Sequence, residues 1–322
     1  MLTLTIPNYI TSLSGDLFHG CDKFIELYNL SEIYIDKYSH VFSFNLKAIH
    51  TDLSEDSIIF NYDDFIFSYV NNIATLESYI GTNIALELPL SFYYKDNLIN
   101  SYNLGNSTFK GCNNITNIII PSFIEKIGMW TFDGCTSLDY NLFDNAYYIG
   151  NSDNPYLILM KVGDIYINDC IINDSCKFIY SYAFSQCTYL SSIIIPNNVV
   201  MIGLEAFSGC TNLKNVSLSN NLVYISQLVF YNTGITSIEI YEGVTEIEIF
   251  AFYNCQSLEN VILPKSLTYL GNMLFEDCPL ITSVSYNGTT TEWNNLIAYC
   301  GSGWKGGSSI TKIVCSDGEI LV

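Results

Sequence analysis

One pattern of apolar positions recurs along the chain. Phenylalanines stand at 184, 207, 230, 252 and 275, so their numbers rise in steps of 23, 23, 22 and 23. After each Phe, apolar side chains return at set distances, for example Leu213, Val216 and Leu218 after Phe207. The last two are separated by two positions, the alternation of a β-strand with one buried side. A fixed period of this length predicts stacked coils, each adding one short strand to a parallel sheet, with few or no long helices.

Other residue types recur within the same unit. A proline follows several of the predicted strands, as at Pro196 and Pro264, and lacks the N–H that a strand would need to continue. Gly128, Gly203 and Gly271 come a few residues later, where we expect a turn that needs a permissive backbone. The unit therefore contains a strand, a turn and a return limb that ends at the Phe.

The whole pattern, I-x-I-P-x-x-V-x-x-I-G-x-x-A-F-x-x-C-x-x-L, resembles the BspA-like (Treponema-type) leucine-rich repeat family. Residues 193–213, IIIPNNVVMIGLEAFSGCTNL, match it almost throughout. The resemblance implies a leucine-rich-repeat solenoid, mainly β, and a non-enzymatic protein at the surface of a cell or secreted from it.

The regularity of the pattern divides the chain into four parts. We expect a partial N-terminal repeat at 1–23, degenerate or enlarged repeats at 24–104, and BspA-like repeats at 105–286 with an enlarged coil at about 139–178. Residues 287–322 carry Trp293 and Trp304 and an Asn287-Gly288 pair typical of a hairpin turn, and are predicted to cap the last coil. Because Met1 already lies inside a repeat, we hypothesise that further repeats precede it.

Composition and charge exclude several classes of protein. The chain is 49% hydrophobic, so it is not disordered, and its 12 basic and 32 acidic residues give a formal charge of -20. Such a charge repels phosphate backbones and anionic lipid heads, which argues against nucleic acid and membrane partners. No apolar run reaches the length of a membrane span, and Met1 to Ile10 lacks the pattern of a secretory signal. The compartment stays open.

Most of the eleven cysteines share one position of the repeat. Neighbouring coils are close enough for disulfides, but a regular column of inward-facing side chains better suits small buried thiols. Cys170, Cys176, Cys300 and Cys315 lie outside the column, where pairing of Cys170 with Cys176 or of Cys300 with Cys315 is possible. The column, three residues after each Phe, consists of Cys21, Cys112, Cys135, Cys187, Cys210, Cys255 and Cys278, with Thr233 as a substitute.

Catalytic and metal-binding patterns are weak. The three histidines, His19, His40 and His50, have no zinc-site spacing and are expected to be solvated. The acidic pairs Asp63-Asp64 and Glu55-Asp56 are expected to be solvated loop charges. A G-x-G-x-x-G string at Gly301, Gly303 and Gly306 lacks the strand and helix of a nucleotide site. We therefore predict no enzyme and no cofactor or metal.

The outward side of the strands is the candidate protein-contact patch. Isoleucines recur there more often than solubility requires, which favours a contact role. The alternative is structural, because β-branched residues favour strands and flanking loops could cover them. The column, ten residues after each Phe and nine in the shortened unit, consists of Ile119, Ile194, Ser217, Glu239, Ile262 and Ser285.

Together, the pattern and the resemblance favour a protein-binding, adhesin-like repeat protein whose partner is a protein of the extracellular matrix or of another cell surface. Two alternatives remain: a spacer or scaffold region of a longer polypeptide, and an intracellular assembly protein with reduced thiols.

Overall fold

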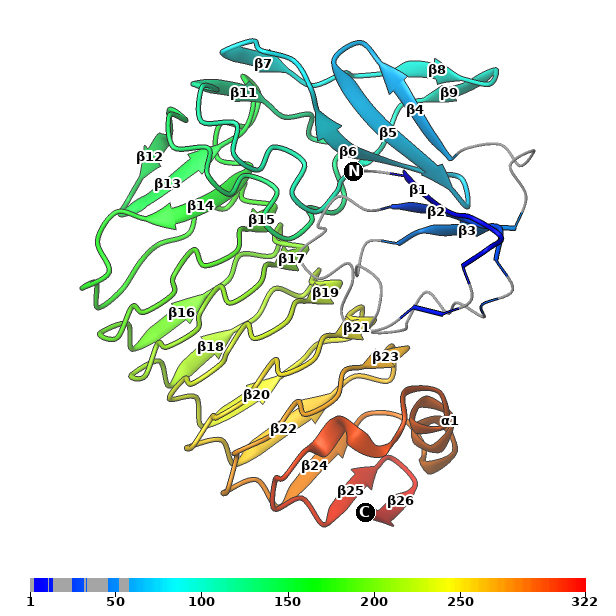
Figure 1. Cartoon of the computed structure of the whole chain (residues 1–322). Helices are drawn as coiled ribbons and strands as arrows, with labels where there is room; N and C mark the ends of the chain where they lie inside the picture. Colours follow the sequence, from blue (N-terminus) through cyan, green and yellow to red (C-terminus); the bar gives the residue numbers. More distant parts are fainter. Residues whose placement is uncertain (1–2, 11, 14–24, 32, 34–45, 52–57) are drawn as a thin grey trace. The chain divides into compact units, whose positions relative to one another are not determined.

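The computed structural model describes residues 3–10, 12–13, 25–31, 33, 46–51 and 58–322 (Figure 1). The chain divides into an N-terminal unit, residues 1–138, and a C-terminal unit, residues 139–322. Over the described residues, both units contain β-solenoid coils, about 11 turns in all, with mainly parallel strands and one short helix. The predicted fold class, a leucine-rich-repeat solenoid, is confirmed.

Each regular coil of the C-terminal unit contributes to two parallel sheets. The first sheet face holds the strands predicted from the pattern, and the second runs through the return limbs (Figure 1). The first face consists of β16 (Ser192–Ile194), β18 (Asn215–Ser217), β20 (Ser237–Glu239), β22 (Asn260–Leu263) and β24 (Ser283–Tyr286). The return limbs carry β15 (Phe178–Ile179), β17 (Met201–Ile202), β19 (Tyr224–Ile225), β21 (Glu246–Ile247) and β23 (Tyr269–Leu270).

The repeat period is visible in the strand register. Ile193 pairs with Val216, and Ile179 pairs with Ile202, in each case the equivalent position one coil further along the chain. The shortened coil loses its residue between Phe230 and Ser237. There the first face is interrupted between β18 and β20, whereas the return-limb sheet continues without a break.

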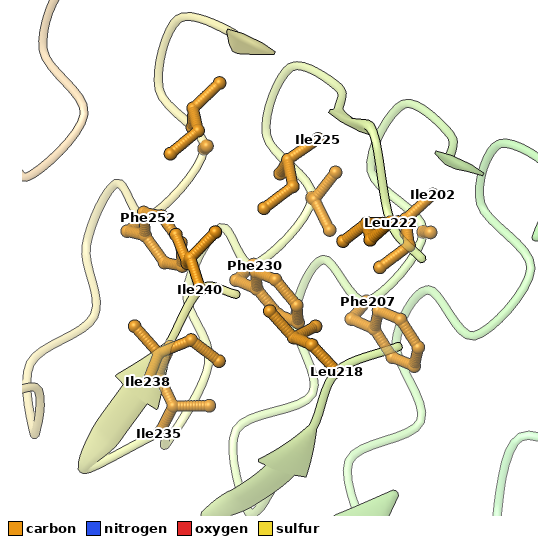
Figure 2. Packing of buried hydrophobic residues seen from close by; sticks show 14 of the residues in the cluster. Ile202, Phe207, Leu218, Leu222, Ile225, Phe230, Ile235, Ile238, Ile240 and Phe252 are labelled. Atoms are coloured by element: carbon orange, nitrogen blue, oxygen red, sulfur yellow. The ribbon is translucent and has the colours of Figure 1, made fainter. Parts of the chain in front are cut away.

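Stacked phenylalanine rings form the centre of the C-terminal unit (Figure 2). Phe184, Phe207, Phe230, Phe252 and Phe275 are all 0% exposed. Successive rings lie 5.0–5.6 Å apart between centroids and within 12° of parallel. In the N-terminal unit Phe109 and Phe132 stack in the same way at 5.5 Å. We call the five-ring stack the phenylalanine ladder; because it is fully buried, it contributes a large share of the apolar stabilisation of the unit.

The cysteine column lies beside the phenylalanine ladder. The Sγ–H groups of Cys210, Cys255 and Cys278 donate to the carbonyl of the Phe in the preceding coil at 3.0–3.1 Å. Thr233 occupies the same column, and its hydroxyl donates to the Phe230 carbonyl at 3.0 Å. The ten cysteines in the described part of the chain are free thiols, and neither considered disulfide is present. The prediction of buried thiols is confirmed for most of the column, while Cys112 is half-buried and Cys21 lies outside the described residues.

The prediction that the regularly spaced glycines serve a turn with a permissive backbone is wrong. None of Gly128, Gly203 and Gly271 has a positive φ. A Cβ on Gly203 would lie 2.7 Å from the Ser181 backbone nitrogen, and one on Gly271 would lie 2.2 Å from that of Ile249. These glycines are needed because neighbouring coils approach closely, not because the turn is left-handed.

The left-handed backbone conformation does occur in the coils that contain the repeated Phe, at the residue two positions before it. Bulky side chains tolerate this conformation poorly, so the coil geometry imposes it. The residues, with φ of 52° to 62°, are Ser107, Trp130, Tyr182, Glu205, Leu228, Phe250 and Met273.

The N-terminal unit interrupts its coils with antiparallel strands. Strands β1 (Thr3–Ile6), β2 (Glu26–Asn29) and β3 (Ala48–His50) are parallel and about one coil apart. The next strands, predicted as degenerate coils, instead form an antiparallel meander and a hairpin. These are β4 (Ile59–Tyr62), β5 (Phe65–Val70), β6 (Ile73–Tyr79), β8 (Phe92–Tyr94) and β9 (Asn97–Ile99). The coils resume with β7 (Ala85–Glu87), β10 (Asn103–Leu104) and β11 (Asn117–Ile119).

The enlarged coil of the C-terminal unit also contains antiparallel strands. β12 (Asn141–Phe143), β13 (Ala146–Ile149) and β14 (Ile158–Val162) are antiparallel to one another, and β14 joins β15 in parallel. The extra residues are therefore accommodated at the edge of the return-limb sheet.

Helix α1 (Thr290–Cys300) lies in the segment predicted to cap the array. The hairpin expected at Asn287-Gly288 is wrong, because Thr289 caps α1 and β24 pairs in parallel with β25 (Lys312–Cys315). The 3-10 turn η1 (Ser302–Lys305) follows α1. Strand β26 (Gly318–Leu321) then pairs with β25 and ends the sheet. Trp293 and Trp304 are buried, and the Trp304 ring meets Phe275 edge-on at 6.1 Å.

Candidate protein-contact surface

Five of the six predicted contact residues lie in one column on the first sheet face. Within the C-terminal unit, Ile194 pairs with Ser217, Glu239 with Ile262, and Ile262 with Ser285. Ile262 is half-buried, and the other four are exposed. Figure 1 shows β16, β18, β20, β22 and β24 succeeding one another along one side of this unit. The column is therefore real, but only Ile194, at 73% exposure, is a strongly exposed apolar side chain.

The sixth predicted residue belongs to the other unit. Ile119 lies in β11 of the N-terminal unit, where it pairs with Glu87 of β7. Its side chain is 38% exposed. Ile119 therefore belongs to the two-stranded sheet of β7 and β11, whereas the other five residues belong to strands of the C-terminal unit.

The outward-facing residue two positions before each member of this column is polar and uncharged. Side chains there alternate between serine and asparagine, and four of the five are exposed. Such side chains can donate and accept hydrogen bonds without the desolvation cost of a charge, as serine and asparagine do in the binding loops of antibodies. They are Ser192, Asn215, Ser237, Asn260 and Ser283.

The enlarged coil and the coil after it carry a more apolar set of exposed side chains, of which only Ile194 was predicted from the sequence. Ile171 stands one repeat period before Ile194 and takes the same outward position, since its neighbours Cys170 and Ile172 point into the core. The two isoleucines are 68% and 73% exposed. Tyr166 and Tyr189, also one period apart, have their ring centroids 6.0 Å from each other and are 68% and 54% exposed. We call Tyr166, Ile171, Tyr189 and Ile194 the tyrosine–isoleucine patch.

Backbone N–H groups next to these side chains donate hydrogen bonds to aspartates. An Asp144 side-chain oxygen accepts from the Ile171 backbone N–H at 2.8 Å, and one of Asp164 accepts from that of Tyr166 at 2.9 Å. Asp169 is exposed two residues before Ile171. The patch therefore combines apolar side chains with nearby carboxylates.

The histidine prediction is wrong for the one histidine that is described. His50 is buried in β3, its Nε2 lies 2.9 Å from Glu26 Oε1, and its ring stacks on Tyr28 at 4.6 Å. Glu26 is 0% exposed and also accepts from the Ile58 backbone N–H. The pair belongs to the packing of β1–β3. His19 and His40 lie outside the described residues.

The remaining chemical candidates are loops or buried groups. Asp63 and Asp64 are exposed in the turn between β4 and β5, as predicted, whereas Glu55-Asp56 lies outside the described residues. Gly301, Gly303 and Gly306 follow α1 and lie around η1, and not between a strand and a helix as the glycines of a nucleotide site do. In the described parts of the chain, no three His, Cys, Asp or Glu side chains meet as metal ligands.

Burial keeps the thiols of Cys135, Cys170 and Cys176 in their neutral form. It raises the pKa of Cys135, Cys170 and Cys176 to about 12, against an ordinary value of 9.0. The thiolate is the nucleophile and metal ligand, so these cysteines are poor candidates for either role at neutral pH.

The described part of the chain contains no helix with the length and apolar character that crossing a bilayer requires.

The chain matches one family model in sequence. The model, described as "BspA type Leucine rich repeat region", matches in six copies over residues 90–153 and 167–302. Strands β16 to β24 of the first sheet face lie within the second stretch. So do three of the four residues of the tyrosine–isoleucine patch, all but Tyr166. No curated protein matches the chain significantly.

Solved structures with similar folds are bacterial repeat proteins. A leucine rich cell surface protein from Faecalibacterium prausnitzii is 18% identical with a TM-score of 0.47, over 76% of this chain and 98% of that one. The pneumococcal vaccine antigen PcpA is 10% identical with a TM-score of 0.45, over 81% and 100% of the two chains. A leucine-rich repeat protein from T. pallidum is 20% identical with a TM-score of 0.33, over 76% and 96%.

Proposed function

Because this chain belongs to the family of proteins with BspA-type leucine-rich repeats, we propose that it is a non-enzymatic, adhesin-like module that binds a protein partner through its first sheet face. Such repeats are generally binding modules. The partner is a protein of the extracellular matrix or of another cell surface.

One observation carries the proposal: the outward positions of β16 to β24 form an ordered, largely uncharged surface over a rigid core. Among the inward residues of the same strands, Ile193, Ile238 and Val261 are at most 3% exposed, and Val216 is half-buried. The outward positions can therefore vary without disturbing the phenylalanine ladder. A rigid array of side chains also loses little conformational entropy on binding.

Binding of the full chain to immobilised extracellular-matrix proteins and to intact cells tests the proposal. We expect saturable binding that is weakened at least tenfold when Ser217→Arg and Ser285→Arg are introduced together. These arginines project from exposed positions of the first sheet face and would obstruct close contact. A normal thermal unfolding midpoint would show that the variant is folded.

The matched control carries Asn220→Arg and Tyr299→Arg, which add the same charge at exposed positions outside the strands. We expect it to bind like the unmodified chain. Equal binding by all three proteins, or no saturable binding by the unmodified chain, would contradict the proposal.

A location at the surface of the producing cell belongs to the same proposal. Cleavage of the chain by a protease added to intact cells tests it, and complete protection until the cells are lysed would contradict it.

A further inference from the structure

The tyrosine–isoleucine patch exposes more apolar surface than the coil fold demands. In the next coil the positions of Tyr189 and Ile194 are taken by Asn212 and Ser217. Strand β18 forms with these polar residues and pairs with β16 in full register. Strand formation therefore does not explain why two adjacent coils carry two tyrosines and two isoleucines that are each at least 54% exposed.

Two adjacent coils supply the patch, so its side chains are held at fixed spacing. Ile171 and Ile194 occupy equivalent outward positions, and coils in such a stack are separated by about 4.8 Å. The tyrosine rings lie at 63° to each other, a contact of ring edge with ring face. Stable positions of this kind are typical of anchor sites in protein interfaces, where a few apolar and aromatic side chains dominate the binding energy.

The charge around the patch indicates what the partner carries. Residues 139–190 contain six aspartates and two lysines, a formal charge of -4. One of the lysines, Lys161, has its ammonium 4.8 Å from the centre of the Tyr140 ring and 5.7 Å from that of Tyr147. Asp144, Asp164 and Asp169 remain exposed near the patch. An anionic rim favours a cationic partner and disfavours an anionic one.

We infer that the tyrosine–isoleucine patch docks a protein segment in which large apolar side chains alternate with lysine or arginine. The inference rests on the proposed protein-binding function and specifies the chemistry of the partner. The apolar side chains pack on Ile171 and Ile194. The cations lie near the aspartates and over the faces of Tyr166 and Tyr189.

Fluorescence anisotropy with three synthetic peptides tests this inference on the full chain. The probe alternates leucine with lysine, and the two comparison peptides alternate leucine with glutamate and serine with lysine. We expect saturable binding of the leucine–lysine peptide at least tenfold tighter than that of either comparison peptide. Equal affinity for the serine–lysine peptide would show attraction by net charge alone and would overturn the inference.

Two variants locate the binding. Ile171→Ser with Ile194→Ser is expected to weaken binding of the leucine–lysine peptide at least tenfold. Asp169→Asn is expected to weaken it twofold to fivefold and to reduce its dependence on salt. Tyr299→Ser, a change at a residue that is 78% exposed on α1, is the control and is expected to leave the affinity unchanged.

Failure of this inference is distinguishable from failure of the proposed function. If the double serine variant binds the leucine–lysine peptide as tightly as the unmodified chain, the inference is overturned. The proposed function would still stand if Ser217→Arg with Ser285→Arg abolished binding to matrix or cell surfaces.

Discussion

The two units of the chain bury polar atoms in different ways. Among the described residues of the C-terminal unit, the buried polar side chains are hydroxyls and thiols, such as those of Ser208, Thr233 and Cys210. The described residues of the N-terminal unit bury hydroxyls and the Cys135 thiol as well, and in addition two carboxylates, Glu26 and Glu77. Glu26 contacts His50, and Glu77 accepts hydrogen bonds from Lys47 and Ser68.

This difference shows what regularity allows. In the regular coils, the Sγ–H or hydroxyl of the cysteine column donates to a Phe backbone carbonyl of its own or the preceding coil. The same hydrogen bond therefore recurs along the array. The N-terminal carboxylates have individual partners instead: Glu26 contacts His50 across the parallel strands β2 and β3, and Glu77 is bound by Lys47 and Ser68. We expect the C-terminal unit to respond mainly to changes in packing and the N-terminal unit mainly to changes in charge.

The largest expected effect is the loss of one ring from the phenylalanine ladder. Phe207→Ala removes a fully buried ring that stacks on Phe184 and Phe230, so the free energy of unfolding should fall by about 3–5 kcal/mol. Urea denaturation followed by circular dichroism measures it. Ile194→Ala, at an exposed position, should change stability by less than about 0.5 kcal/mol. Equal effects of the two changes would refute the packing role of the ladder.

Alkaline pH should destabilise the C-terminal unit. Unfolded thiols lose their proton near pH 9.0, whereas Cys170 and Cys176 keep theirs until about pH 12 in the folded chain, because burial raises their pKa. Between these values the folded state holds more protons, so stability falls as pH rises. Each of the two thiols accounts for about 1 kcal/mol at pH 10. Denaturation curves at pH 8 and pH 10 check this, and equal stability at both values would contradict it.

A smaller effect is expected from the buried carboxylate of the N-terminal unit. Glu26→Gln removes the charge that faces His50 and leaves one acceptor oxygen where two stood, so stability of this unit should fall by about 2 kcal/mol. Hydrogen exchange of the β1–β3 amides measures it. Glu259→Gln, at an exposed position in the C-terminal unit, is the control. Unchanged protection of β1–β3 would mean that the carboxylate does not stabilise these strands.

The smallest effect concerns the close approach of neighbouring coils. Gly271→Ala places a Cβ against the Ile249 backbone nitrogen, and separation of the coils should cost about 1 kcal/mol. Gly318→Ala is the matched control, since its Cβ would meet only the Thr290 Cγ2 at an ordinary 3.7 Å. A thermal midpoint lowered in the first variant and not in the second is the expected result. Equal midpoints would contradict the steric role of Gly271.

The sequence predicts the parts of the fold that depend on a period. Phe184 to Phe275 lie where the period places them, because each ring packs on the ring one coil away. The β4–β6 meander was missed, since antiparallel pairing leaves no signal at the repeat spacing. The left-handed backbone at Leu228 and Phe250 was missed for another reason: coil geometry imposes it on side chains that do not favour it.

The candidate site shows the same limit. Ile194 and Ser217 were found because they follow a Phe at a set distance. Ile171 and Tyr166 were missed because their coil has Lys161 where a Phe would mark the repeat. Their separation from Ile194 and Tyr189 by one repeat period was the signal that could have identified them. His50 was misjudged because its partner Glu26 lies a coil earlier, and one sequence gives no sign of that pairing.

The shortened coil has a consequence for how such a protein can change over evolutionary time. Losing one residue between Phe230 and Ser237 interrupts the first sheet face but leaves the phenylalanine ladder and the return-limb sheet continuous. Each stretch from one Phe to the next is thus nearly interchangeable with its neighbours. Recombination that duplicates or deletes one such stretch would lengthen or shorten the array without requiring a new core. The outward residues would then diverge independently in each copy.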